Sequence, residues 1–402
     1  MTDFARVTTA VSNLYNTYPF PPEPLLDEAP PGYNWRWNWI AAHDFCLGRA
    51  PRTEKIRILD AGCGTGVGSE YLVHLNPQAT VTGIDLSTEA LAIARERCQR
   101  SGADRATFQH LSLYDADQVP GEFDLINCVG VLHHLPDPIR GIQSLAPKLA
   151  PGGLMHIFVY AALGRWEITL MQQAIAQLQG DRRGDYRDGV QVGRQLFATL
   201  PQDNRLVQRE TERWSLENQR DECFADMYVH PQEVDYTVDT LFELIDASGL
   251  EFLGFSNPKY WNLARLIGQA PDLMARTAGW SDRDRYRLIE RLDPSLTHFE
   301  FFLGKPPLTR SDWRNDDDLR QAHVMRHPCI DGWPGNCVFN YDYEILHLDQ
   351  PSVSGLEQCP PNLPSPHLNT PTVQTVLDTS NADVSTIRQL LAQGLIVLSP
   401  PQ

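Results

Sequence analysis

The residues best suited to binding chemistry form a glycine-rich run, Ile58-Leu-Asp-Ala-Gly-Cys-Gly-Thr-Gly66, at the end of an apolar segment. Glycine lets a ligand approach the backbone closely, and a helix that begins there offers unpaired N–H groups. Asp85 ends the next apolar segment, where a carboxylate can accept hydrogen bonds from two ribose hydroxyls. The spacing G-x-G-x-G departs from the dinucleotide pattern G-x-G-x-x-G, because Val67 and Ser69 stand where another glycine is required.

A second group of side chains has the chemistry to accept or orient a proton. The candidates are His133 and His134 after the fourth apolar segment, Tyr160 at the end of the fifth, His230 in the run 226–231, and the N-terminal Tyr15 and Tyr18. His133, His134, Tyr160 and His230 are taken as the candidate catalytic residues. For the two adjacent histidines, the alternative is a structural role, in capping a helix or in packing beneath a cofactor.

These residues lie at the ends of apolar segments that alternate with helix-length segments. Strands are predicted at 55–60, 81–85, 107–111, 123–129 and 154–160. A helix after Asp85 is marked by Ser87 as its N-cap, Glu89 in its first turn and Gly102 at its end. Strands that alternate with helices predict an α/β fold with a parallel, doubly wound sheet.

Two later segments, 250–255 and 298–303, have the character of further strands, and a capped helix is predicted at 237–248. The segments 164–236 and 257–296 are therefore predicted to be insertions between strands of one sheet, where a substrate lid would sit. In the first insertion, one helical face is marked by Ile168, Met171, Ile175 and Leu178.

With these motifs in order, the sequence resembles a known family, the class I S-adenosylmethionine (AdoMet)-dependent methyltransferases. The run 59–66 is similar to the family's first motif, and the runs 128–138 and 149–154 are similar to later ones. The resemblance covers 55–163 well and 237–304 more loosely. It implies a seven-stranded, mostly parallel, Rossmann-like sheet, AdoMet as cofactor and methyl transfer as activity. The cofactor-binding residues that it implies are Asp60, Gly62, Cys63, Gly64, Gly66, Asp85, Leu86, Ser112, Leu113, Cys128 and Val129.

One position departs from the family pattern. Many members place an aspartate after the third strand, where its carboxylate accepts a hydrogen bond from the adenine amino group. Here that place falls near Ser112 and Leu113, with Asp115 slightly later. Either Ser112 substitutes as the acceptor or Asp115 reaches back.

Composition limits the setting and the partners. The 402 residues include 34 Lys and Arg against 51 Asp and Glu, a formal net charge of −17, which makes nucleic acid an unlikely partner. The N-terminus has no secretory pattern, and the longest apolar stretch, 154–163, is too short to span a membrane. Cys63, Cys98 and Cys128 fall in apolar patterns typical of buried thiols, so a reducing, cytoplasmic setting is predicted.

Three regions are expected along the chain. Residues 1–50 are predicted to be an irregular arm, with a proline-dense segment at 17–24 and alternate tryptophans in 33–39. Residues 51–304 are expected to form the AdoMet-binding domain. Residues 305–402 are rich in proline, and part of them is similar in outline to a small winged-helix unit, with loose packing onto the main domain as the alternative.

A zinc site is a further idea that the sequence raises. Two histidines and two cysteines, namely His323, His327, Cys329 and Cys337, have suitable donor atoms. Their spacing matches no compact zinc motif, and the nearby prolines indicate loops. The sequence therefore predicts no metal.

The leading hypothesis is methyl transfer to a small or medium-sized organic acceptor of the quinone or natural-product kind, because long insertions favour an enclosed pocket. One alternative is a protein or RNA methyltransferase that uses the C-terminal extension for recognition. Another is a non-catalytic scaffold, against which the intact glycine run and Asp85 argue. The acceptor atom, the oligomeric state and the role of 305–402 are not indicated by the sequence.

Overall fold

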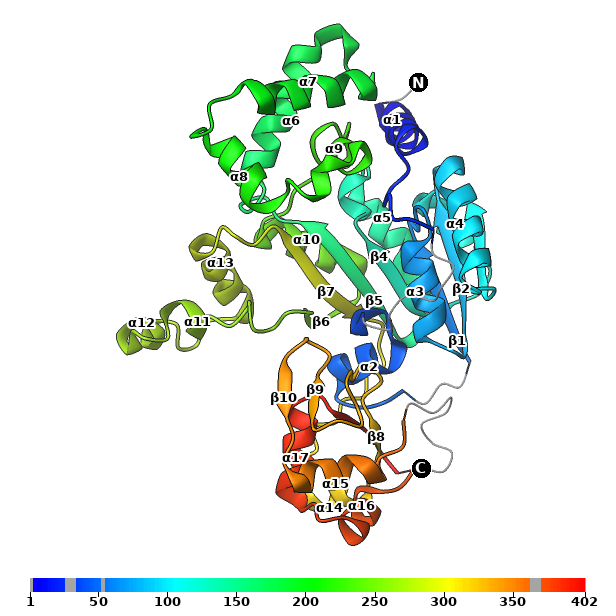
Figure 1. Cartoon of the computed structure of the whole chain (residues 1–402), viewed down its shortest axis with the longest axis vertical. Helices are drawn as coiled ribbons and strands as arrows, with labels where there is room; N and C mark the ends of the chain where they lie inside the picture. The colour runs from blue at the N-terminus through cyan, green and yellow to red at the C-terminus, as the bar shows by residue number, and fades with distance from the viewer. Residues whose placement is uncertain (1–2, 26–33, 52–54, 362–369, 402) are drawn as a thin grey trace.

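The computed structural model describes residues 3–25, 34–51, 55–361 and 370–401 (Figure 1). A seven-stranded sheet with the order β3-β2-β1-β4-β5-β7-β6 runs through its centre. Strands β1 to β5 are parallel, and β7 is antiparallel to both β5 and β6. The strands are β1 (Ile56–Ala61), β2 (Ala79–Asp85), β3 (Ala106–His110), β4 (Phe123–Val129), β5 (Leu149–Tyr160), β6 (Glu251–Phe255) and β7 (His298–Gly304). The predicted α/β fold with a mostly parallel, seven-stranded sheet is confirmed.

Helices cover both faces of this sheet, which is why its central strands are almost wholly apolar. Neighbouring residues of β1 face opposite layers: Ile58 packs with α2 (Trp39–Leu47), α3 (Val67–Leu75) and α4 (Thr88–Arg100). Leu59 packs with α5 (Pro138–Leu145) and α10 (Val238–Ser248). The predicted caps are confirmed, since Ser87 caps α4, and Thr237 and Gly249 bound α10. None of the described helices is long and apolar enough to cross a membrane.

Two groups of helices interrupt the strand order. The first, after β5, contains α6 (Trp166–Gln179), α7 (Tyr186–Thr199), α8 (Arg205–Arg213) and α9 (Asp221–Tyr228), and it forms the green lobe at the top of Figure 1. The second, between β6 and β7, contains α11 (Ala264–Ile267), α12 (Pro271–Arg276) and α13 (Asp282–Leu292), and it extends to the left. On α6, Ile168, Met171 and Ile175 are buried as predicted, but Leu178 is 62% exposed.

The N-terminal region is not irregular as predicted. It contains α1 (Asp3–Thr17) as well as α2. The alternating tryptophans lie in two separate helical elements, since Trp35 and Trp37 belong to the 3-10 helix 35–37 and Trp39 begins α2, which Asn38 caps. Trp35 and Trp39 are both buried. Tyr33 of the same run lies outside the described residues. Leu14 of α1 packs into the core of α6, α7 and α9, so a long-range contact supports this helix.

Short 3-10 helices complete this part of the chain: η1 (Trp35–Trp37), η2 (Leu113–Gln118), η3 (Leu132–His134), η4 (Ala146–Lys148), η5 (Gly180–Arg182) and η6 (Glu217–Gln219). Two of them follow strand ends. Ser112 caps η2 after β3, and η3 comes directly after β4.

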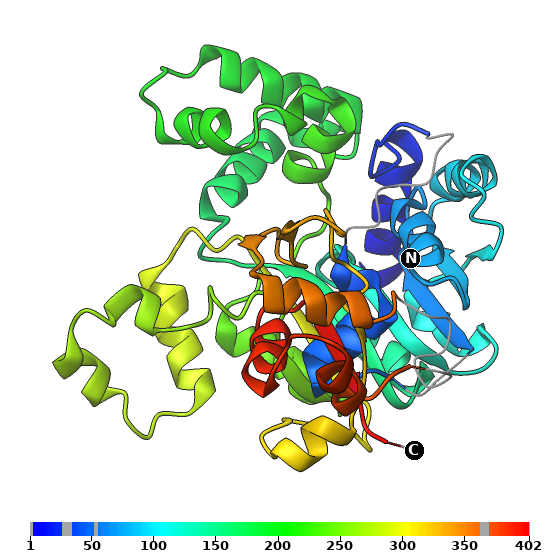
Figure 2. The ribbon, with the colours of Figure 1, turned by 60° about the horizontal axis from the view of Figure 1, so that its bottom comes forward.

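The C-terminal elements pack around a hydrophobic core of their own. They are α14 (Asp316–Gln321), β8 (His323–Arg326), β9 (Cys337–Phe339), β10 (Ile345–His347), α15 (Gln350–Gln358), α16 (Val373–Thr379), α17 (Val384–Ala392) and β11 (Ile396–Ser399). β8 pairs with β11 and β9 with β10, both antiparallel. Figure 2 shows these elements beside the blue N-terminal segment, where the N–H of Ala50 donates to the carbonyl of Leu398 at 2.7 Å.

Candidate functional site

The glycine run forms the loop between β1 and α3. Gly62, Gly64 and Gly66 have φ angles of +82°, +51° and +82°, which other residues adopt only with strain. The space around the loop is also taken, because a Cβ on Gly64 would lie 2.3 Å from the carbonyl oxygen of Phe20. The loop therefore requires glycine for its conformation and for the close approach of the N-terminal segment.

Two carboxylates flank the loop. Asp85, at the end of β2, accepts hydrogen bonds from the N–H of Gly64 at 2.9 Å and from the N–H of Ser87 at 2.8 Å. Asp60, at the end of β1, accepts from the Ser69 hydroxyl at 2.6 Å and the Asn127 amide at 2.9 Å. Burial raises the pKa of both carboxyl groups, and these hydrogen bonds oppose the rise.

A cavity of about 690 Å³ begins at this loop and extends to α9. The residues expected at the site that line it are Asp60, Gly62, Cys63, Gly64, Asp85, Leu86, Leu113, Val129, His134 and Tyr160. Tyr15, which the sequence raised as a further candidate, lines it as well. Sequence reasoning missed other lining residues, among them Phe20, Arg165, Trp214 and Asp226.

Five expected residues lie elsewhere: Gly66, Ser112, Cys128, His133 and His230. The Ser112 side chain accepts from the N–H of Tyr114 at 3.3 Å, and Cys128 is fully buried in the sheet core. His133 is also fully buried and stacks on the Tyr160 ring, with 3.9 Å between ring centroids. His230 lines a neighbouring cavity of about 550 Å³.

The N-terminal segment covers the glycine loop with its main chain. The carbonyl of Phe20 accepts from the N–H of Thr65 at 3.1 Å, and the carbonyl of Pro21 accepts from the Thr65 hydroxyl at 2.6 Å. Arg97, which is 1% exposed, donates to the carbonyls of Glu23 and Pro24 at 2.6 and 2.9 Å. Arg97 also lies 3.6 Å from the buried carboxylate of Glu70.

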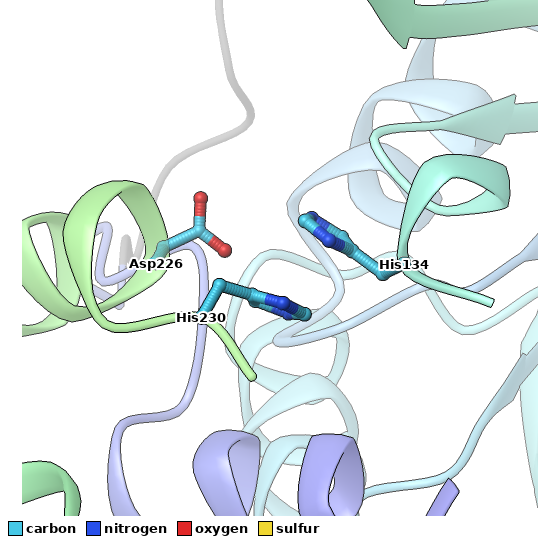
Figure 3. Close-up of side chains that lie close together, drawn as sticks. All are labelled: His134, Asp226 and His230. Atoms are coloured by element: carbon cyan, nitrogen blue, oxygen red, sulfur yellow. The ribbon is translucent and has the colours of Figure 1, made fainter. Parts of the chain in front are cut away.

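At the far end of the cavity, Asp226 of α9 and His134 of η3 lie close to His230, which follows α9 (Figure 3). The Tyr15 hydroxyl on α1 donates to the Asp226 carboxylate on α9 at 2.8 Å. His134 of η3 and His230, just after α9, stack with 3.7 Å between ring centroids. Metal-ligating atoms of Asp226, His134 and His230 lie within 4.8 Å of one another. Asp226 was not singled out from the sequence, although it begins the same run, 226–231, that contains His230.

Both histidines form a hydrogen bond with the main chain of the same residue, Gln232. The Gln232 carbonyl lies 3.1 Å from Nδ1 of His134, and its N–H donates to Nδ1 of His230 at 3.2 Å. Burial lowers the pKa of His134 to about 3 and that of His230 well below its ordinary value. Both rings are therefore neutral near pH 7. Burial raises the pKa of Asp226 to about 6, while the Tyr15 hydrogen bond and Arg165 oppose that rise.

A buried cation borders the same end. The Arg165 guanidinium lies 3.4 Å from the centroid of the Tyr160 ring and pairs with Glu233 at 3.0 Å and Asp235 at 3.7 Å. Burial raises the pKa of Tyr160 beyond its ordinary range. Tyr160 therefore stays protonated and can act as a hydrogen-bond donor.

The zinc constellation is not assembled. Within the described part of the chain, His134, Asp226 and His230 are the group close enough to share a metal ion, and the four residues in question do not form such a group. His323 Nδ1 lies 2.9 Å from the Thr370 carbonyl, and His327 accepts from the N–H of Cys329 at 3.1 Å. Cys329 is buried, whereas Cys337 is exposed.

Comparison with known proteins assigns a domain type to the part of the chain that contains the glycine loop. Residues 59–155 match the model of a methyltransferase domain. A ubiquinone biosynthesis O-methyltransferase of Aromatoleum aromaticum is 42% identical over 119 residues, which is 29% of this chain and 47% of that protein. The chain thus spans less than half the length of this relative.

Two other relatives are matched over most of their own length. An uncharacterized protein of Synechococcus sp. is 58% identical over 98% of this chain and 94% of that protein. A protein named for the phycocyanin operon of Pseudanabaena tenuis is 72% identical over 96 residues, 24% of this chain and 91% of that protein.

Among solved structures, that of PKMT2 from Rickettsia typhi with AdoHcy superimposes with a TM-score of 0.60. The superposition covers 95% of this chain and 77% of that one, at 16% identity, and so reports on the fold. The sheet order and the methyltransferase domain match agree with the motifs. Through this domain, the chain belongs to the class I AdoMet-dependent methyltransferases.

Proposed function

We propose that the chain methylates a polar atom of a small or medium-sized organic acceptor, and that the cavity between the glycine loop and α9 holds AdoMet and the reacting group together. One observation carries the proposal: a single cavity is lined by Gly64 and Asp85 at one end and by Tyr15, His134 and Asp226 at the other. Cavities of this size enclose drug-sized ligands.

The residues around the loop fit AdoMet. The hydrogen-bond partners of the buried Asp60 carboxylate, Ser69 and Asn127, are neutral, so the ammonium group of the ligand would complement its charge. Asp85 is assigned to the ribose hydroxyls, and Leu86 and Leu113 to the faces of the adenine. Neither Ser112 nor Asp115 lines the cavity, so no side-chain acceptor for the adenine amino group is assigned.

When bound, the cofactor would supply a methyl group on a sulfonium sulfur, and this sulfur is the group that the acceptor atom displaces in line. The protein contributes position, because holding the two atoms about 3 Å apart removes most of the entropic barrier. The N-terminal segment excludes water above the loop, and the Tyr160 hydroxyl offers a donor beside the reacting group. His133, Cys128 and Gly66 are assigned structural roles.

Calorimetry with S-adenosylhomocysteine tests the cofactor half of the proposal. Tritium transfer from labelled AdoMet tests the acceptor half, with a cell extract of the source organism divided into low-molecular-mass and protein fractions. We expect binding with one site per chain and label in the low-molecular-mass fraction. Absence of binding, or label confined to protein, contradicts the proposal.

A protein acceptor is the second candidate. The observation that favours it is the strong similarity of part of this chain to a protein named for the phycocyanin operon. The match to the ubiquinone methyltransferase does not decide between the two classes, because it spans under a third of this chain. Label on purified phycocyanin subunits in the tritium assay would support this candidate, and the low-molecular-mass fraction then serves as the control.

A further inference from the structure

The two stacked histidines face different cavities: His134 lines the far end of the cavity that begins at the glycine loop, and His230 lines the neighbouring one. A carbonyl oxygen only accepts, so His134 carries its proton on Nδ1, bonded to Gln232, and its Nε2 holds a lone pair. The Gln232 N–H only donates, so Nδ1 of His230 holds a lone pair and its Nε2 carries the proton. In the described part of the chain, Nε2 of His230 has no hydrogen-bond partner.

This proton arrangement argues against a metal ion between Asp226, His134 and His230. A metal needs a lone pair from each imidazole, and Nε2 of His230 has none while Gln232 donates to Nδ1. The two rings are also nearly parallel, at 23°, and a metal lies close to the plane of each imidazole that binds it. The hydrogen bonds of the three residues therefore favour proton transfer over metal binding.

We infer that Asp226 is the catalytic base of the methyl transfer and that Tyr15 is a positioning residue that holds its carboxylate. The inference rests on the proposed function. As the acceptor heteroatom forms its bond to the methyl carbon, the bond between that carbon and sulfur breaks and its electron pair stays on sulfur. The acceptor proton passes to the Asp226 carboxylate and later to solvent. The lone pair on Nε2 of His134, which lines the same cavity, orients the acceptor.

Three features of the geometry support Asp226. Its carboxylate lines the cavity together with Tyr15 and His134. One oxygen is held by the Tyr15 hydroxyl, which leaves the other free of that bond. Figure 3 shows the carboxylate and the two imidazoles turned toward a common centre. A base that touches the acceptor needs this placement at the end of the cavity opposite the glycine loop.

The surrounding charges suit a base that works near neutral pH. The groups that face Asp226 are Tyr15 on α1, His134 on η3, Tyr160 on β5, Arg165 before α6, and Cys223 and His230 in or after α9. Burial, opposed by Tyr15 and Arg165, sets the pKa of Asp226 at about 6. The carboxylate is thus ionised at pH 7 but binds a proton more readily than an exposed aspartate.

An acceptor-free measurement tests the positioning role. Carbon-13 NMR of protein labelled at aspartate carboxyl groups follows the Asp226 signal, assigned by its loss in Asp226→Asn. We expect a midpoint near pH 6 in the wild type. In Tyr15→Phe we expect a higher midpoint, because the lost hydrogen bond stabilised the charged form. An unchanged midpoint in Tyr15→Phe overturns the positioning role.

A kinetic measurement tests the catalytic role of Asp226. The acceptor is the extract fraction that takes up tritium from labelled AdoMet, and it is supplied at limiting concentration. We expect Asp226→Asn to lower kcat/KM at least 100-fold, with Asp226→Glu recovering part of it. In Tyr15→Phe the acid limb of the pH profile moves to higher pH. Asp221→Asn is the matched control, since Asp221 is an exposed carboxylate on the same helix, paired with Arg194. Wild-type rates in Asp226→Asn overturn the inference.

Failure of the inference and failure of the proposed function give different results. If S-adenosylhomocysteine does not bind the wild type, the proposed function fails. If it binds equally to the wild type and Asp226→Asn, and both label the acceptor equally, the inference alone fails. A stoichiometric transition metal in the purified protein that Asp226→Asn loses also overturns the inference, because the three residues would then be metal ligands.

Discussion

The main-chain N–H of Gly64 and the carboxylate of Asp85 are joined by a hydrogen bond of 2.9 Å. The acid at the end of β2 thereby holds the loop that follows β1, so one side chain both shapes the glycine loop and faces the cavity. With Asp85 in its proposed role, this contact couples cofactor binding to the geometry of the loop.

Replacement of Asp85 should therefore weaken cofactor binding strongly. In Asp85→Asn the charge-assisted contacts are lost, and such contacts contribute about 1.5–3 kcal/mol each. We expect the Kd for S-adenosylhomocysteine, measured by calorimetry, to rise about 10- to 100-fold. Asp104→Asn, at an exposed position, is the control and should bind as the wild type does.

Substitution of Gly64 should be far more damaging than substitution of another glycine with positive φ. Gly64→Ala and Gly102→Ala share a strained backbone that costs about 1–2 kcal/mol in each. Only at Gly64 would the added Cβ meet the Phe20 carbonyl, whereas no described atom lies within 4 Å of a Cβ at Gly102. Urea denaturation should show a larger loss for Gly64→Ala, with reduced cofactor affinity. Equal losses would contradict this account of the loop.

Replacement of the His133 imidazole by an apolar ring should stabilise the fold without changing the affinity for the cofactor. His133 is fully buried, and neither ring nitrogen has a hydrogen-bond partner among the described residues. Burying a polar group without a partner costs about 1–3 kcal/mol, which an apolar ring avoids. We expect His133→Phe to raise the Tm and to bind S-adenosylhomocysteine normally. A loss of turnover with normal binding would instead restore a catalytic role for His133.

The stability of the fold should depend on pH through Glu300 of β7, the strand between β5 and β6. Hydrogen bonds and charge from His156, with Arg36 and Ser256, outweigh burial and lower the pKa of Glu300 to about 2. A depressed folded-state pKa stabilises the fold above the unfolded value near 4.5, and the stabilisation is lost as the pH falls toward 2. Glu300→Gln should lower the free energy of unfolding at pH 7 by up to about 3 kcal/mol. The difference from the wild type should shrink by pH 3, as urea titrations at both pH values would show.

The end of the cavity at the glycine loop could be predicted from sequence because its signals are local. The glycine run and Asp85 follow successive strands, and parallel strands bring their carboxyl ends to one edge. The end of the cavity that is proposed to hold the acceptor depends on contacts between distant segments. Tyr15 and Asp226 are 211 residues apart, and His134 and Gln232 are 98 apart, so no spacing in the sequence indicates either pair.

The histidine pair illustrates the same limit. His133 and His134 are adjacent and of one type, so no sequence pattern distinguishes their roles. In η3 they point to different surroundings: His133 packs beneath Tyr160, and His134 lines the cavity. The helix α1 was missed for a related reason, since its partner, the core of α6, α7 and α9, comes from an insertion far along the chain.

The segment that covers the glycine loop is held through the carbonyl oxygens of Phe20, Pro21, Glu23 and Pro24. Every residue type has a main-chain carbonyl oxygen, so these hydrogen bonds depend on the position of the backbone and not on most of the side chains. The segment should accept many substitutions in a mutational scan. Deleting or inserting a single residue there should be costly, because it moves the carbonyls out of register with Thr65 and Arg97.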